Sequence, residues 1–262
     1  MDLMIPVALT IAGSDPSGGA GIQADLKTFH QRKVYGMAVI TLFTVQNTCG
    51  VRAVYPLGPR KVVEQLTAVL KDIKPVAVKT GALGDAAIIR AVAGIARRFS
   101  FPLVVDPVMV SKHGAPLLKS SAVKALKKDL FPYAALVTPN LMEAELLSQI
   151  RIRKFSDMKE AAKRILALGP QAVLIKGGHL KGAATDLFHD GKKTILLKAA
   201  RLKTRHTHGT GCTFSAAATA ELAKGKNLLT SVRIAKKFIT QAIRTAPGLG
   251  HGFGPVNHFV KV

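Results

Sequence analysis

Short apolar runs alternate with longer amphipathic stretches along most of this 262-residue chain. Residues 59–72 carry Val62, Leu66 and Val69 at helical spacing, which predicts an amphipathic helix that begins near Pro59. The shorter apolar runs have the length of buried strands instead. The pattern predicts further helices at 22–29, 86–99, 141–147 and 216–223, and strands at 5–13, 38–44, 76–79, 103–105, 136–138 and 172–176.

Strands that alternate with helices are typical of a layered α/β fold with a mostly parallel central sheet flanked by helices. Asp190 and Gly191 separate the runs at 186–189 and 194–197, which indicates a hairpin and therefore an antiparallel edge. The chain has no internal repeat, low-complexity tract or linker-like segment. We therefore expect residues 1–262 to form a single domain.

The chain is strongly basic, with 38 Lys and Arg, 15 Asp and Glu, and a formal charge of +23. Such a charge attracts polyanions through the summed field. However, the basic residues are scattered, without an aromatic-interleaved stripe or a recognition helix, so no specific nucleic acid is expected as a partner. Two cysteines, no signal-peptide pattern and no membrane-spanning apolar run favour a cytoplasmic protein with no membrane partner.

A turn broken by glycines at residues 207–215 runs straight into the small-residue helix predicted at 216–223. Gly209 and Gly211 would allow positive φ angles, which gather several backbone N–H groups into one concavity. The positive end of the helix dipole would add to their attraction for an anion. The turn therefore predicts a phosphate-binding site.

Polar residues follow the predicted strands closely: Gln46, Gly81, Asp106, Asn140 and Lys176. Because the carboxyl ends of parallel strands meet at one edge of a sheet, these residues are expected to face one crevice. Carboxylate and amide oxygens suit Mg²⁺, and a lysine can neutralise a transferred phosphoryl group. From the residues alone, a small-molecule kinase is favoured over a nucleotide-binding module.

Seven stretches, in order over nearly the whole chain, closely resemble the hydroxymethylpyrimidine/phosphomethylpyrimidine kinase family. They are residues 9–15, 18–25, 45–48, 105–112, 138–145, 175–179 and 208–212. The resemblance implies a ribokinase-like three-layer fold. It also implies ATP-dependent phosphorylation of 4-amino-5-hydroxymethyl-2-methylpyrimidine to its monophosphate and then its diphosphate, in thiamine biosynthesis. ATP and Mg²⁺ are the implied cofactors, and a homodimer is the implied assembly.

The resemblance also implies residues for the pyrimidine. Gln46 would hydrogen-bond the aminopyrimidine edge, because a carboxamide offers both a donor and an acceptor. Gly13 and Asp25 would supply a wall and a polar contact. Some family members have a methionine where this chain has Ala82, so Met109 is an alternative source of the stacking contact.

On the nucleotide side, the resemblance assigns Mg²⁺ to Asn140 and Glu143, with Asp106 acting through water. Glu143 is also placed as the third residue of a capping box that starts at Asn140. Lys112 and Lys176 would be cations beside the phosphates, and backbone N–H groups of Gly209, Gly211 and Cys212 would form an anion hole. Gly178 and Thr210 complete the predicted nucleotide contacts.

Cys212 is a candidate base, because a helix N-terminus can lower the pKa of a thiol. The alternative is that it only positions the anion hole. His208 precedes the turn and is expected to be structural or to lie on the nucleotide side.

A pyridoxal-type vitamin kinase on the same fold remains an alternative, since both kinds of kinase can keep the Gly-Thr-Gly-Cys turn. Gln46 and residues 106–112 favour the pyrimidine enzyme. A basic nucleic-acid-binding protein is the remote alternative.

Overall fold

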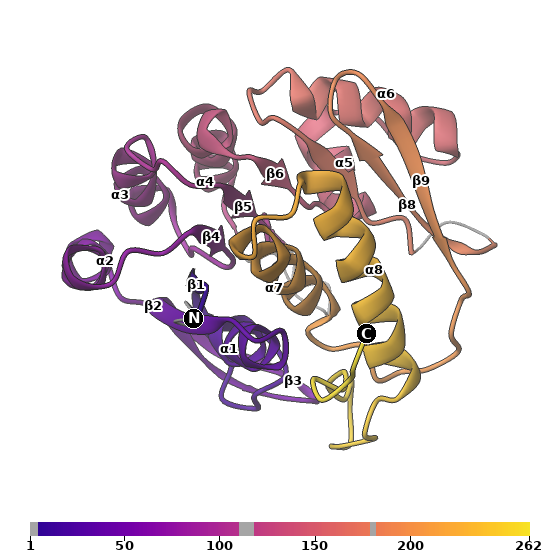
Figure 1. The fold of residues 1–262 in the computed structure, drawn as a ribbon, viewed down its shortest axis with the longest axis horizontal. Coiled ribbons are helices and arrows are strands. Elements are labelled where there is room, and N and C mark those ends of the chain that lie inside the picture. The colour runs from indigo at the N-terminus through magenta and orange to yellow at the C-terminus, as the bar shows by residue number, and fades with distance from the viewer. Residues whose placement is uncertain (1–4, 110–117, 179–181) are drawn as a thin grey trace.

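The computed structural model describes residues 5–109, 118–178 and 182–262, and its centre is a nine-stranded sheet (Figure 1). The strand order is β3-β2-β1-β4-β5-β6-β7-β8-β9. The strands from β2 to β7 run parallel, whereas β3, β8 and β9 pair antiparallel at the two ends. The bounds are β1 Val7–Ser14, β2 Tyr35–Asn47, β3 Gly50–Pro56, β4 Ala77–Thr80, β5 Leu103–Val105, β6 Leu136–Val137, β7 Val173–Ile175, β8 Ala184–His189 and β9 Thr194–Ala199.

Helices cover both faces of the sheet and give the fold three layers (Figure 1). One apolar core lies between the sheet and α2 (Pro59–Asp72), α3 (Ala86–Ala96), α4 (Ser120–Ala125), α5 (Leu141–Ser148) and α6 (Phe155–Leu166). A second core lies beneath α1 (Gly21–Gln31), α7 (Thr210–Ala223) and α8 (Leu228–Arg244). A π-helical turn at Leu126–Leu130 and a 3-10 turn at Phe131–Tyr133 link α4 to β6.

The predicted α/β architecture is confirmed, and the helix at 59–72 and the strand at 103–105 have the predicted bounds. The cap residues are also confirmed. Asp85 accepts hydrogen bonds from the backbone of Ala87 and Ile88, and Asn140 forms a reciprocal capping box with Glu143. Both caps satisfy backbone N–H groups that have no partner inside the helix.

The structure differs from the sequence prediction at two places that matter for the site. Gln46 lies inside β2 rather than after it, because β2 continues into a hairpin with the unpredicted strand β3. In addition, α7 begins at Thr210, so Gly211 is helical. Of the two glycines at 209 and 211, only Gly209 has a positive φ, of 78°.

The helix α7 is buried from Thr213 to Ala223, between the sheet and α1 and α8. Its alanine and serine side chains permit this close packing on several sides. Rigid packing of α7 fixes its N-terminus at the carboxyl edge of the sheet. Within the described part of the chain, no helix has both the length and the apolar character needed to cross a membrane.

Candidate active site

A cavity of about 610 Å³ lies where the carboxyl ends of the central strands meet the N-terminus of α7. In a parallel sheet, neighbouring loops that leave the carboxyl ends of the strands toward opposite faces open a crevice between them. The cavity brings together twelve of the predicted site residues. They are Gly13, Gln46, Ala82, Asp106, Asn140, Glu143, Lys176, Gly178, Gly209, Thr210, Gly211 and Cys212.

Two predicted substrate contacts do not line the cavity, and this corrects their assignment. Asp25 lies on the buried face of α1 and is fully inaccessible to solvent. Met109 is only 2% exposed and packs in the apolar core beneath the site, where its backbone N–H donates to Glu143 Oε1 at 3.0 Å. Lys112 lies outside the described residues.

Asp25 instead forms a buried ion pair with Lys79, a residue at which the sequence analysis placed no function. Lys79 Nζ lies 2.8 and 2.9 Å from the two carboxylate oxygens, and Thr10 donates to Oδ2 at 2.6 Å. Burial alone would lower the pKa of Lys79, but attraction to Asp25 raises it above its usual value. A charged residue at the end of an apolar strand is the signal that could have revealed this pair.

The side of the cavity that the sequence predicts to bind phosphate combines the α7 N-terminus with one lysine. The first N–H groups of a helix lack intrahelical acceptors. In α7 the N–H of Thr210 donates to the Thr207 carbonyl at 3.3 Å, so the N–H groups of Gly211 and Cys212 are the candidates for an anion in the cavity. A Cβ at Gly211 would lie 3.2 Å from Lys176 Nζ, so glycine lets the ammonium approach the helix closely. Lys176 also lies 3.0 Å from Asp106 Oδ1.

Lys176 keeps its positive charge in this environment. Burial would lower its pKa, but the carboxylates of Asp106 and Glu143 raise it above the usual value. Such a fixed cation can neutralise charge on a phosphoryl group without reorganising solvent.

The surroundings of Cys212 bear on its two candidate roles, base and positioner of the anion hole. Burial raises the pKa of its thiol to about 12, with Asp25 and Asp106 adding to the rise and Lys79 opposing it. The helix dipole therefore does not produce a thiolate here, because the thiol is desolvated among carboxylates. The Gly21 backbone hydrogen-bonds to the thiol, which ties the α7 turn to the start of α1. A positioning role fits this environment better than a base.

The predicted magnesium residues already have partners. Glu143 accepts from the backbone of Met109 at 3.0 Å and of Asn140 at 2.8 Å, while Asn140 Oδ1 accepts from the Glu143 backbone at 2.9 Å. Asp106 accepts from Lys176, Thr138 and Ser215. In residues 5–109, 118–178 and 182–262, no group of three or more His, Cys, Asp and Glu side chains could hold a metal by itself.

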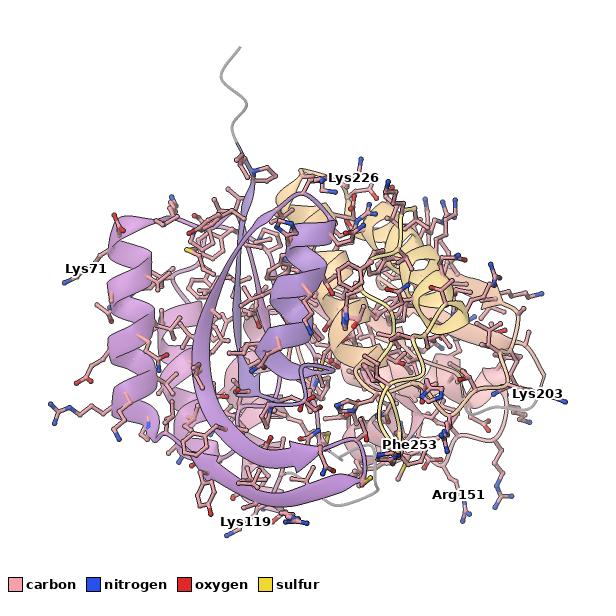
Figure 2. The ribbon with its side chains drawn as sticks, turned by 90° about the horizontal axis from the view of Figure 1, so that it is seen from below. Lys71, Lys119, Arg151, Lys203, Lys226 and Phe253 are labelled. Atoms are coloured by element: carbon pink, nitrogen blue, oxygen red, sulfur yellow. The ribbon has the colours of Figure 1, made fainter. Side chains whose placement is uncertain are left out.

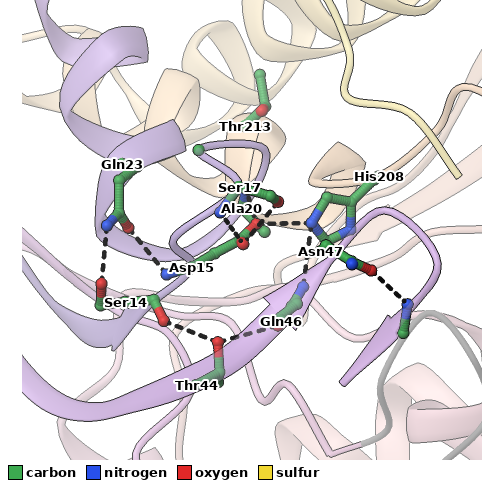
Figure 3. Close-up of polar contacts among 12 residues, drawn as sticks. Ser14, Asp15, Ser17, Ala20, Gln23, Thr44, Gln46, Asn47, His208 and Thr213 are labelled. Atoms are coloured by element: carbon green, nitrogen blue, oxygen red, sulfur yellow. Dashed lines mark hydrogen bonds and ion pairs between the residues drawn. The ribbon is translucent and has the colours of Figure 1, made fainter. Parts of the chain in front are cut away.

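Directly before Gly209, His208 joins Gln46 to Asp15 (Figure 3). Its Nε2 lies 2.7 Å from Asp15 Oδ2 and 3.3 Å from the Gln46 amide nitrogen. His208 contacts the loop that follows β1, which fits the structural alternative of the two that were expected for it. Asp15 was not predicted for the site, although its place directly after a buried strand is the signal that marked Asp106.

Similarity to known proteins agrees with this geometry. The family model described as phosphomethylpyrimidine kinase matches residues 15–257. A hydroxymethylpyrimidine/phosphomethylpyrimidine kinase from Synechococcus elongatus is 46% identical over 259 residues, which are 98% of each chain.

Two solved structures show the same architecture. A phosphomethylpyrimidine kinase from Clostridium difficile aligns with a TM-score of 0.81 at 45% identity, over 91% of this chain and 99% of that one. A pyridoxal kinase from Staphylococcus aureus, in complex with AMP-PCP and pyridoxal, aligns with a TM-score of 0.90 at 39% identity, over 97% and 94% of the two chains. With its fold, its cavity and its near full-length match taken together, the chain belongs to the phosphomethylpyrimidine kinase family.

Proposed function

We propose that this protein transfers a phosphoryl group from ATP to 4-amino-5-hydroxymethyl-2-methylpyrimidine and then a second one to the resulting monophosphate. The observation that carries the proposal is one cavity lined both by the carboxamide of Gln46 and by the cation and helix N-terminus of the phosphate side. A carboxamide suits an aminopyrimidine edge, and the other groups suit a phosphoryl group in transfer.

In this mechanism, most of the rate enhancement comes from positioning and charge. The transferred phosphoryl group passes through a loose transition state, so early removal of the acceptor proton gains little. Lys176 and the N–H groups of the first turn of α7 stabilise the charge on the phosphoryl oxygens. Gln46 holds the pyrimidine so that the acceptor oxygen faces this turn.

Mg²⁺ would enter with the nucleotide rather than occupy a protein cage. Mg²⁺ keeps several waters and is usually held by one or two carboxylates together with substrate phosphates. Asp106 and Glu143 line the cavity as hard oxygen donors, and Asn140 holds Glu143 in place. These residues fit a water-mediated ion, which would neutralise charge on the phosphates.

Pyridoxal is the second candidate acceptor, because the S. aureus pyridoxal kinase is so similar in fold. The test is an ADP-release assay with hydroxymethylpyrimidine, its monophosphate and pyridoxal side by side. We expect turnover on both pyrimidines and lower kcat/KM on pyridoxal. Turnover on pyridoxal alone would refute the proposed function.

A further inference from the structure

Three side chains from distant parts of the chain meet at the wall of the cavity: Asp15, Gln46 and His208 (Figure 3). The same nitrogen of His208 faces the other two, at 2.7 Å from Asp15 Oδ2 and 3.3 Å from Gln46 Nε2. The chemical state of that nitrogen therefore determines how the amide of Gln46 can bond.

Asp15 requires a proton on His208 Nε2. Its Oδ1 accepts from the Ser17 backbone at 2.9 Å and from the Ser17 hydroxyl at 2.7 Å, and its Oδ2 accepts from the Ala20 backbone at 2.8 Å. Burial would raise the pKa of Asp15, but the hydrogen bonds from His208 and Ser17 lower it overall. An ionised carboxylate only accepts hydrogen bonds, so the fourth partner, His208 Nε2, must donate.

The single hydrogen on His208 Nε2 is donated to Asp15 at 2.7 Å, so the Gln46 amide avoids a clash of donors only when its oxygen, rather than its NH₂ group, lies beside this N–H. With the amide nitrogen toward the ring, two donors would face each other across 3.3 Å. A half-turn of the amide places its oxygen there and brings its nitrogen near Thr44 Oγ1, which lies 3.2 Å from the present oxygen position. Thr44 can accept, because its own hydroxyl donates to the carbonyl of Ser14 at 3.1 Å.

The imidazole is also held in place mechanically. His208 is 7% exposed, its backbone N–H donates to the Gly254 carbonyl at 3.0 Å, and its carbonyl accepts from Val256 at 3.2 Å. A Cβ at Gly19 would overlap the ring, so glycine lets the loop close over it. A ring fixed in this way can set the orientation of its neighbour.

We propose that Asp15 and His208 are positioning residues that fix the order of acceptor and donor that Gln46 presents to the cavity, and thereby select the acceptor molecule. The inference rests on the proposed function. The 4-amino group adjoins the ring carbon that carries the hydroxymethyl group, so it lies nearer the α7 turn than the ring nitrogen does when that group faces the turn. His208 directly precedes Gly209 of the turn, so an amide oxygen beside the imidazole lies on the side of the amino group, and the amide nitrogen is left for the unprotonated ring nitrogen. A 4-oxo ring offers a carbonyl next to a ring N–H, which is the reverse order. Because the hydroxymethyl group must face the phosphate, the ring cannot turn over to compensate.

The functional test compares kcat/KM for the 4-amino substrate and for its 4-oxo analogue. We expect His208→Leu to lower the amino-to-oxo preference by about tenfold or more, through the KM for the pyrimidine, with the KM for ATP nearly unchanged. His208→Gln, which keeps a side-chain donor, should retain most of the preference. Thermal melting confirms that each variant is folded.

The outcomes separate the two proposals. If the unmodified enzyme turns over neither pyrimidine, the proposed function fails. If it prefers the amino substrate and folded His208→Leu has the same preference within about twofold, or if the KM values for pyrimidine and ATP rise equally, the positioning role is wrong.

A spectroscopic measurement on the free protein does not depend on turnover. Long-range ¹H–¹⁵N correlation spectra at neutral pH should show a protonated Nε2 on His208. Asp15→Asn should allow the other tautomer, because an amide can donate as well as accept. An unprotonated Nε2 in the unmodified protein would overturn the inference.

Discussion

The α-carbon of Gly209 lies against the carbonyl oxygen of Gly19, so closely that a Cβ at residue 209 would overlap that oxygen. The backbones of the loop after β1 and of the turn before α7 are therefore in direct van der Waals contact. Gly209 also has a φ of 78°, a region that side chains other than glycine rarely adopt.

Gly209→Ala should therefore displace the anion-binding turn. We expect kcat to fall by about a hundredfold or more, because the N–H donors no longer point at the phosphoryl oxygens. Gly225→Ala is the matched control, since Gly225 has a φ of 77° and open space around it. The control should lose about 1 kcal/mol of folding stability and keep its activity. Near-normal kcat for Gly209→Ala would contradict this account of the turn.

The raised pKa of Cys212 changes the expectation for its removal. A thiol with a pKa of about 12 is protonated at neutral pH, so it does not act as a thiolate base in the free enzyme. We expect Cys212→Ala to slow the alcohol and monophosphate steps by a similar factor, below about tenfold. Single-turnover rates on the two acceptors test this. A large loss confined to the alcohol step would restore the role of base.

Much of the fold was predictable because local patterns decide it. The apolar face of α2 and the caps at Asp85 and Asn140 depend on neighbours within one or two turns. The carboxyl-edge rule likewise placed Asp106 and Lys176 in one cavity.

The errors concern contacts between distant segments. The pairing of Asp25 with Lys79 and of His208 with Asp15 depends on how helices and loops cross the sheet, and sequence spacing does not encode this. For the same reason the sequence left the role of Cys212 open, because the burial of its thiol near Asp25 and Asp106 depends on segments distant in the chain.

Stability at acid pH should depend on His258. This ring is 6% exposed and accepts or donates a hydrogen bond with Thr213 at 3.0 Å, and burial, aided by Lys27, lowers its pKa to about 4 from 6.5. The unfolded chain therefore takes up the proton first, and stability falls as pH drops below about 6.5. The loss should reach up to about 3 kcal/mol near pH 4.

Urea unfolding of His258→Gln measures this contribution, because glutamine keeps a hydrogen-bonding group but does not titrate. Between pH 7 and pH 5, the variant should lose less stability than the unmodified protein. His251→Gln, at an exposed site, is the control for the substitution itself. If the free energy of unfolding of His258→Gln changed with pH as it does in the unmodified protein, the His258 ring would not contribute to the loss of stability at acid pH.

The basic surface should bind nucleic acid only weakly. At least six acidic residues are buried, so Lys and Arg dominate the surface, and the labelled basic side chains point outward from separate parts of the molecule (Figure 2). We expect sequence-independent binding that falls by about tenfold or more between 50 and 200 mM salt. Fluorescence anisotropy with unrelated DNA and RNA duplexes measures it. Tight, sequence-selective binding at physiological salt would contradict this expectation.

In the proposed function, one cavity phosphorylates both the alcohol and the monophosphate. The direct measurement is the yield of ADP per hydroxymethylpyrimidine with ATP in excess, with the products followed by ³¹P NMR. We expect two ADP per pyrimidine, with the monophosphate appearing first and the diphosphate as the final product. A yield of one ADP with the monophosphate as the end product, or no consumption of the pyrimidine, would contradict it.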